Sequence, residues 1–240
     1  MRAFRARDYD IARRILRRSL RKDPQDAKAW ALLGEVHWVL DRKRLAVRAL
    51  RSATRLDSRD AYSFMRLGDI LSELDGAAPR AIAAQQRATR LDPRLSGVWR
   101  LLAEAYEADG RTVRAVAAYR RHLLLERGDK MARVQLGNAL ARLGRLAQAE
   151  KELRGAARRD PRDPDAVFGL GEVYQRGERF QAAERAFRKV VRMCPRDAYP
   201  RIKLAEVLER LGQRDQAAVQ ARAVVRIEPG WRRFVRSFLH

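Results

Sequence analysis

The chain repeats itself at an interval of 34 residues, and this periodicity limits the possible folds more than any other feature of the sequence. An alanine recurs at this interval, with a single gap of 35, at Ala12, Ala46, Ala81, Ala115, Ala149, Ala183 and Ala217. A fixed period of this length is the signature of a repeat protein, in which each unit buries its apolar face against the next one.

Each repeat has the features of two amphipathic helices, with apolar residues three and four positions apart. A leucine and then a small residue precede the last six alanines, as Leu33-Gly34, Leu67-Gly68, Leu102-Ala103, Leu136-Gly137, Leu170-Gly171 and Leu204-Ala205. Small residues in both helices let the two helices approach closely. Proline at the repeat end stops the second helix, because it cannot continue one. Glycine suits the left-handed turn between the helices, at Gly110, Gly144 and Gly212.

These positions resemble the tetratricopeptide repeat family. One repeat matches the family pattern at Trp99, Leu102, Ala103, Tyr106, Ala115 and Tyr119, and another at Leu170, Gly171, Tyr174, Ala183, Phe187 and Pro195. The resemblance implies an all-α fold, a right-handed α-solenoid of tetratricopeptide helix-turn-helix repeats, and we expect a bacterial member of the family. The expected organisation is one continuous domain with an N-terminal half repeat (second helix) at 1–26, repeats at 27–60, 61–95, 96–129, 130–163, 164–197 and 198–231, and a C-terminal capping helix at 232–240.

Three segments depart from the regular pattern. The stretch 75–79 carries one extra residue, and Pro79 is expected in the first turn of the following helix. The N-terminal helix is expected from Asp8 to Lys22, with too little chain before it for a partner helix, so its apolar side is predicted to be open. Near the C-terminus, the spacing of apolar residues predicts a short helix that covers the last repeat through Trp231, Phe234, Val235 and Phe238.

Charge is distributed unevenly over the expected helices. The chain has 53 Lys and Arg against 30 Asp and Glu, for a formal net charge of +23. The six first helices carry no net charge, the six second helices carry +17 and residues 1–26 carry +5. In proteins that the chain resembles, the first helices line a concave groove and the second helices face the convex side. This predicts a basic convex face, at Arg13, Arg14, Arg17, Arg18, Arg21, Arg48, Arg51, Arg55, Arg185, Arg188 and Arg192.

The basic face has two interpretations. It could bind an anionic partner, which would be nucleic acid, an acidic protein or a membrane surface. Alternatively, it is a solvated outer surface whose arginines reflect a genome that favours arginine codons.

The expected groove is acidic and apolar. One position is acidic in five of the six repeats, and neighbouring groove positions carry apolar residues. The predicted partner-binding residues are Glu35, Trp38, Tyr62, Met65, Asp69, Glu104, Met131, Val134, Asn138, Phe168, Glu172, Tyr199, Ile202 and Glu206. Such a surface fits a peptide or helix with basic and apolar side chains. In the alternative, the acids pair with arginines four residues later, as in Glu172–Arg176 and Glu206–Arg210.

The sequence gives no indication of catalysis. It contains no phosphate-binding loop, dinucleotide fingerprint or metal-ligand spacing, and Cys194 is its single cysteine. We therefore expect no enzyme, no cofactor and no metal. No apolar run long enough for a membrane span and no signal peptide are found, which predicts a cytoplasmic chain that is either complete or part of a longer one.

Three functions fit these observations. The leading hypothesis is a protein–protein interaction scaffold or adaptor that holds a partner segment in the groove. The others are binding of an anionic partner on the convex face and self-assembly, in which the N-terminal helix accepts a helix of another copy.

Overall fold

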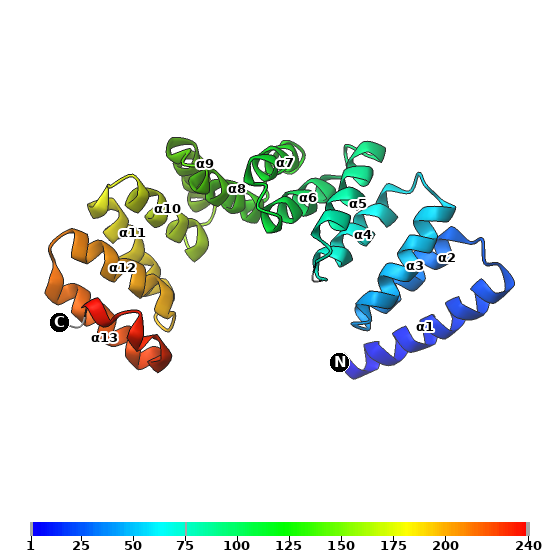
Figure 1. The fold of residues 1–240 in the computed structure, drawn as a ribbon, viewed down its shortest axis with the longest axis horizontal. Helices are drawn as coiled ribbons and strands as arrows, with labels where there is room; N and C mark the ends of the chain where they lie inside the picture. The colour runs from blue at the N-terminus through cyan, green and yellow to red at the C-terminus, as the bar shows by residue number, and fades with distance from the viewer. Residues whose placement is uncertain (1, 75, 239–240) are drawn as a thin grey trace. The chain divides into compact units, whose positions relative to one another are not determined.

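A computed structural model describes residues 2–74 and 76–238, and this part of the chain consists of helices joined by turns. The prediction of an all-α repeat fold is confirmed (Figure 1). The helices group into two compact units, Met1–Arg127 and Gly128–His240, where the sequence predicted one continuous domain. Each unit is therefore described separately.

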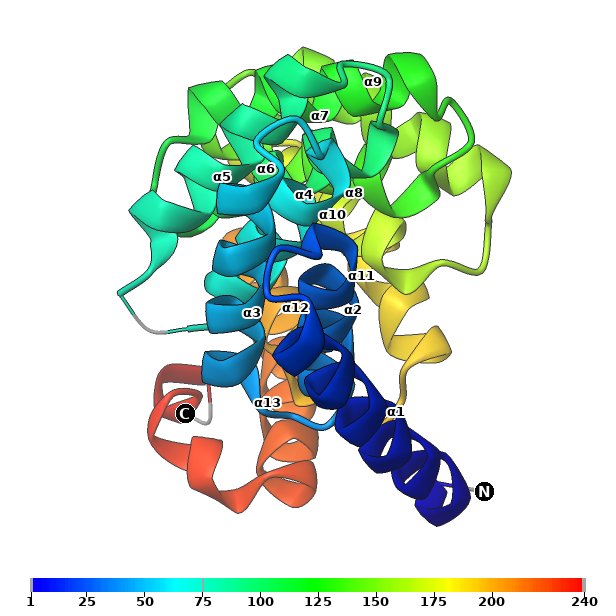
Figure 2. The ribbon, with the colours of Figure 1, turned by 90° about the vertical axis from the view of Figure 1, so that its right-hand side faces the viewer.

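Unit 1 contains one leading helix followed by helix pairs. Its helices are α1 (Arg2–Lys22), α2 (Ala27–Val39), α3 (Lys43–Leu56), α4 (Ala61–Ser72), α5 (Ala78–Leu91), α6 (Ser96–Ala108) and α7 (Thr112–Leu125). The pairs are α2 with α3, α4 with α5 and α6 with α7, and the second helix of one pair packs on the first helix of the next. Figure 2 shows α1 beside α2 at the start of this stack.

Unit 2 is built in the same way and ends in two short 3-10 helices. Its elements are α8 (Lys130–Arg142), α9 (Leu146–Arg159), α10 (Pro164–Arg176), α11 (Phe180–Met193), α12 (Ala198–Arg210), α13 (Arg214–Ile227), η1 (Pro229–Arg233) and η2 (Arg236–Phe238). In both units the first helices of neighbouring pairs also contact each other, α4 with α6 and α8 with α10. The first helices therefore form a continuous surface within each unit.

Aspartate caps fix where most first helices begin. The carboxylates of five aspartates accept backbone N–H groups of the first helical turn, at Asp26, Asp60, Asp129, Asp163 and Asp197. Such a cap stabilises a helix by about 1 kcal/mol. Every first helix begins at the first residue of a predicted repeat, although the prediction used prolines and overlooked these aspartates.

The two helices of a pair meet where the first helix has a small residue. A Cβ atom added at Gly171 would lie 2.5 Å from Phe187 Cε1, and one at Gly137 would lie 2.5 Å from Leu153 Cγ. Phe187 and Leu153 are fully buried. The glycine thus makes room for a large side chain of the second helix, as the repeat pattern predicted.

The N-terminal helix is longer than expected, because α1 begins at Arg2 instead of near Asp8. It packs on α2 as α3 packs on α4, so it occupies the place of a second helix. Ile11 and Ile15 are exposed on it, as expected of a second helix without a first helix of its own. Whether another copy of the chain covers these residues stays a prediction.

The C-terminal cap differs from the predicted helix. Residues Pro229–Arg233 and Arg236–Phe238 form two 3-10 turns, and residues 239–240 lie outside the described part of the chain. Val235 is buried on α13 with Trp231 and Phe238 packed beside it, but Phe234 is 56% exposed. Val235 lies between the two 3-10 turns and is the buried contact of this segment, while the Phe234 ring packs against Trp231 with the ring centres 5.3 Å apart.

The irregular segment between α4 and α5 includes Asp75, which lies outside the described residues. Pro79 lies in the first turn of α5, where its missing N–H costs little, as predicted.

The turn inside each helix pair uses a left-handed residue at one repeat position. Four of these residues are glycines with φ between 69° and 74°, namely Gly76, Gly110, Gly144 and Gly212. The other two are Asp41 (φ 55°) and Glu178 (φ 56°). In this conformation the Cβ atom of any other residue is crowded by the backbone, and glycine avoids this steric strain because it has no Cβ. The sequence analysis recognised Gly110, Gly144 and Gly212 but neither Gly76 nor the two positions with a side chain.

We predict that Glu178→Gly stabilises the protein by about 0.5–1 kcal/mol, since relief of the left-handed conformation exceeds the entropy that glycine adds to the unfolded chain. Urea unfolding measures this change. Glu178→Gln is the matched control, because it removes the charge and keeps the strain. An equal stabilisation by Glu178→Gln would contradict the backbone explanation.

Candidate functional site

We call the surface formed by the first helices of each unit the first-helix face. In unit 1 it carries six of the predicted groove residues: Glu35, Trp38, Tyr62, Met65, Asp69 and Glu104. They come from α2, α4 and α6. Tyr62 is exposed, and the other five are partly exposed. The structure therefore brings all six to an accessible surface of unit 1.

Arg66 neutralises the acids of this face. It donates from Nε to Glu35 across the repeat boundary (2.7 Å), and it also forms an ion pair with Asp69 of its own helix. Its guanidinium lies 4.6 Å from the centre of the Trp38 ring. Burial raises the pKa of Asp69, and the charge of Arg66 opposes that rise. Two carboxylates of the predicted acidic row are thus already occupied by one arginine.

The remaining acid of unit 1 is also paired. Glu104 accepts a bond from Arg100, four residues earlier on α6 (2.5 Å). The sequence analysis looked for arginines after each acid and missed those before it, Arg66 and Arg100. The signal that could have found them is a basic residue three or four positions earlier on the same helix.

The first-helix face of unit 2 has a different character. It carries Met131 and Asn138 of α8, Phe168 and Glu172 of α10, and Tyr199 and Glu206 of α12. The Phe168 ring lies 5.4 Å from the ring of Tyr199, which is 44% exposed. Phe168 also touches the buried ring of Phe187, with their centres 5.4 Å apart. This contact with the core holds the aromatic pair in place.

The acids of unit 2 do not form the predicted ion pairs. Arg176 donates to the carbonyl oxygen of Ala141 (3.0 Å), and Arg210 lies over the ring of Phe180 (4.9 Å). Glu206 instead accepts bonds from Lys203 (2.9 Å) and Gln175 (3.1 Å). Within the described residues, Glu172 has no ion-pair partner and no side-chain hydrogen bond.

Glu172 borders a shallow pocket of about 350 Å³. The pocket is also lined by Gln175, Arg176, Glu178, Phe180, Lys203 and Arg210. The free carboxylate of Glu172 therefore lies one helical turn from the partly exposed Phe168 and borders a concave surface of the same unit.

Two predicted groove residues are not accessible. Val134 is 3% exposed and Ile202 is 7% exposed, so both side chains belong to the core of unit 2. Buried side chains of this kind are not accessible to a bound protein. Their inclusion in the groove was wrong.

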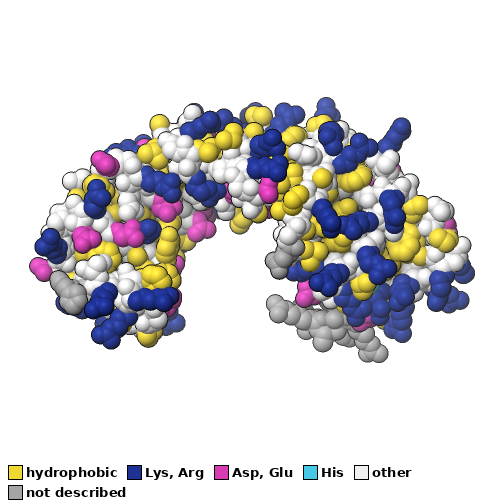
Figure 3. Space-filling view, viewed as in Figure 1, with side chains coloured by type: hydrophobic (Ala, Val, Ile, Leu, Met, Phe, Trp, Pro, Cys, Tyr) yellow, Lys and Arg dark blue, Asp and Glu magenta, His cyan; other side chains and the backbone are white. Residues whose placement is uncertain are grey.

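The predicted basic face is mostly exposed, with nine of its eleven arginines at the surface. The exposed ones are Arg14, Arg17, Arg18, Arg21, Arg48, Arg51, Arg55, Arg185 and Arg192. The two that are partly buried have acidic partners, Arg13 with Asp10 (3.0 Å) and Arg188 with Glu184 (2.8 Å). Lys and Arg side chains gather over the α1–α3 end of unit 1, whereas Asp and Glu are more frequent over α10–α12 of unit 2 (Figure 3).

His37 is buried near three arginines. It is 6% exposed, and its Nδ1 has no hydrogen-bond partner. Burial lowers its pKa, and Arg42, Arg13 and Arg17 lower it further. The unfolded chain therefore takes up a proton near pH 6.5 that the folded chain resists.

We predict that His37 lowers the free energy of unfolding as the pH falls from about 6.5 toward 5, because protonation of the histidine then favours the unfolded chain. Leucine is the residue at the equivalent positions Leu71 and Leu140. His37→Leu should therefore remove this decrease in the free energy of unfolding between about pH 6.5 and 5. Urea unfolding at a series of pH values measures the difference. If the free energy of unfolding changed with pH equally in the unaltered protein and in His37→Leu, His37 would not be the cause.

No group of three or more His, Cys, Asp and Glu side chains among the described residues could hold a metal ion. Over the same residues, no helix is long and apolar enough to cross a membrane. Cys194 is partly exposed and free.

Comparisons with known proteins agree with the helix-pair architecture. Two family models described as tetratricopeptide repeat match the chain, one over residues 1–43 and 134–198 and the other over 98–130. No curated protein matches the sequence.

Solved structures with the same fold share little sequence identity. A tetratricopeptide repeat protein from Parabacteroides merdae is 17% identical with a TM-score of 0.74, covering 83% of this chain and 79% of that one. YrrB, described as a TPR protein with an unusual peptide-binding site, is 19% identical with a TM-score of 0.63, covering 76% and 94%. PilW, a type IV pilus biogenesis factor, is 15% identical with a TM-score of 0.74, covering 89% and 98%. At these identities the likeness concerns the fold alone.

Proposed function

Because the chain belongs to the tetratricopeptide repeat family, whose fold generally serves as a non-enzymatic scaffold for protein–protein interactions, we propose that it is such a scaffold or adaptor. It binds a segment of a partner protein on its first-helix face. The observation that carries this proposal is the combination, in unit 2, of the free Glu172 carboxylate with an aromatic pair that the core holds in place, in which Phe168 is partly exposed and Tyr199 is exposed.

Phe168 and Glu172 are four residues apart on α10, so they lie on one side of the helix. Tyr199 extends the same surface onto α12. Aromatic side chains that the core already holds in one orientation are good anchors, since they lose little conformational entropy when a partner packs on them. An apolar side chain of the partner packs on this pair while a Lys or Arg reaches Glu172.

Unit 1 contributes differently. Its acids are neutralised by Arg66 and Arg100, which removes the attraction that a row of free carboxylates would exert on a basic peptide. The exposed Tyr62 and the partly exposed Met65 remain as apolar contacts beside these ion pairs. Unit 1 therefore offers a partner segment mainly apolar contacts, whereas unit 2 by itself offers a free carboxylate.

We predict that Glu172→Lys weakens binding of a peptide with one aromatic and one basic residue by roughly tenfold, equivalent to about 1.4 kcal/mol. The physical reason is the loss of one charge-assisted hydrogen bond and its replacement by repulsion. Fluorescence anisotropy with peptides drawn from a library of basic-aromatic sequences measures the Kd.

Glu209→Lys is the matched control, because it makes the same charge change at an exposed position of the same unit. Tyr199→Ala should weaken binding as well, through loss of the aromatic contact. Equal effects of Glu172→Lys and Glu209→Lys would show that only net charge matters and would contradict the proposed site.

A further inference from the structure

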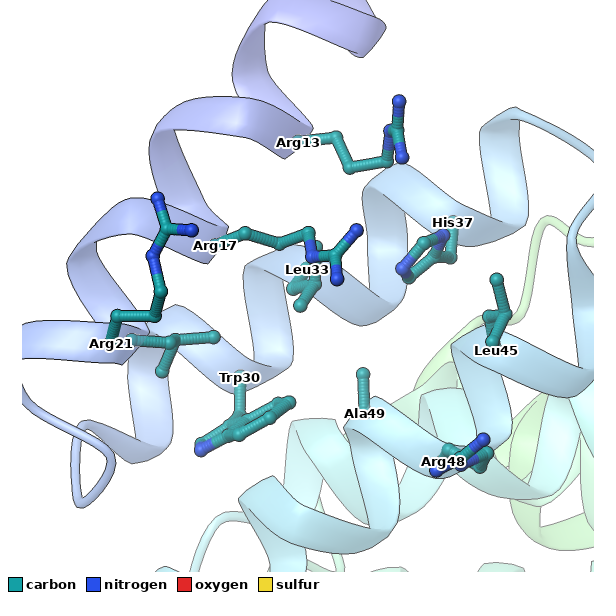
Figure 4. Close-up of a pocket in the computed structure, with 10 residues that line it drawn as sticks. Arg13, Arg17, Arg21, Trp30, Leu33, His37, Leu45, Arg48 and Ala49 are labelled. Atoms are coloured by element: carbon teal, nitrogen blue, oxygen red, sulfur yellow. The ribbon is translucent and has the colours of Figure 1, made fainter.

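A second surface, formed by α1, α2 and α3 of unit 1, has the features of a binding pocket. The pocket measures about 390 Å³ and lies between α1 and α3, with α2 at its base (Figure 4). Its apolar lining includes Trp30, Leu33 and Ala49. The Trp30 Nε1 donates to the carbonyl oxygen of Pro24 (2.9 Å), which fixes the orientation of the indole ring.

Four arginines surround this apolar base. Arg13, Arg17 and Arg21 project from successive turns of α1, and Arg48 comes from α3 on the other side (Figure 4). Arg13 pairs with Asp10 at 3.0 Å. Among the described residues, no carboxylate lies within ion-pair distance of Arg17, Arg21 or Arg48. The pocket therefore carries positive charge that the protein itself leaves uncompensated.

The repeat register explains why this charge is uncompensated here. In α9, Glu150 pairs with Arg154 (2.8 Å), and in α11, Glu184 pairs with Arg188 (2.8 Å). Arg154 and Arg188 occupy the repeat position of Arg17, but the position of their glutamate partners is occupied in α1 by Arg13. An arginine thus stands in α1 where α9 and α11 have the neutralising acid.

The same comparison explains why the base of the pocket is open. In the next two repeats an arginine of the second helix lies over the equivalent aromatic ring, Arg87 over Phe64 (6.0 Å) and Arg121 over Trp99 (5.9 Å). The first repeat has Ser52 at that position. A second pocket of about 500 Å³ is found there, lined by Trp30, Arg48, Arg51, Ser52, Thr54 and Arg55. It shares Trp30 and Arg48 with the first, so the two adjoin along α3.

We propose that this pocket binds an acidic segment of a partner protein, with a bulky apolar side chain of that segment packed against Trp30. Carboxylates on either side of the anchor reach Arg17 and Arg21 from one direction and Arg48 and Arg51 from the other. Carboxylates form bidentate hydrogen bonds with arginine, and these are stronger than hydrogen bonds between neutral groups. This proposal uses other residues than the first-helix face and does not depend on it.

The lining favours a peptide over a nucleic acid. A nucleobase brought against Trp30 would bury its polar edges beside Leu20, Leu33, Leu45 and Ala49, which offer them no side-chain hydrogen bonds. A phenylalanine or leucine side chain has no such groups to satisfy. Phosphates alone would engage the arginines but leave the apolar base unused.

Ser52→Arg tests the proposal most sharply, because it adds a positive charge and also covers Trp30 as in the next two repeats. Two labelled peptides serve as probes, one rich in Asp and Glu with a central phenylalanine, and one with serine in its place. We predict that Ser52→Arg raises the Kd of the phenylalanine peptide roughly tenfold in anisotropy titrations. This is the loss of affinity expected when one apolar anchor is excluded. Simple attraction between charges would instead make binding tighter.

Further variants and probes complete the test. Arg17→Glu should raise the Kd of the phenylalanine peptide. Arg192→Glu makes the same charge change at an exposed site of α11 and should leave this Kd within about threefold of the unaltered protein's value. Ser52→Ala should bind normally, and the serine peptide should bind the unaltered protein more weakly. Unchanged or tighter binding by Ser52→Arg, or equal affinity for both peptides, would overturn the proposal. So would a single-stranded oligothymidylate that binds more tightly than the peptide and is lost in Ser52→Arg.

Discussion

The close approach of the two helices in each pair is the constraint on which the rest of the structure depends. In four pairs the first helix has a glycine at one position, and opposite it the second helix places a buried residue of varying size, Leu50, Gln85, Leu153 or Phe187. Because this contact sets the rotation of both helices, it also decides which residues face outward. Glu35, Asp69 and Glu172 follow the small residue directly and are thereby held on the first-helix face.

Much of this architecture could be predicted from the sequence, because the contact repeats. The alternation of Leu33-Gly34 with Ala46 locates both helices of a pair, and the first helices begin where the repeats were predicted to begin. Individual repeats depart from the common pattern where their local packing differs. Val134 and Ile202 occupy positions expected in the groove but are buried among their neighbours, and the C-terminal residues form 3-10 turns after Pro229 in place of a helix.

The charges of the candidate site were harder to predict, since they depend on where long side chains reach. Arg66 bridges Glu35 and Asp69 because its guanidinium extends across the boundary between two repeats, a contact that spacing along one helix does not reveal. Glu172 stays free because Arg176 bonds to the backbone of α8. The five acids predicted as one row therefore differ in function. The features that suggest binding arise where a repeat departs from its relatives, as Ser52 and Arg13 do, while those that set the fold arise where the repeats agree.

The most direct test of this account is a double-mutant cycle between Gly171 and Phe187, followed by urea unfolding. Gly171→Ala alone should destabilise the protein by about 1–3 kcal/mol through overpacking, although alanine is the better helix former. In the Phe187→Ala background the same change should cost nothing or stabilise the protein. Equal effects of Gly171→Ala in both backgrounds would contradict the claim that this contact fixes the helix pair.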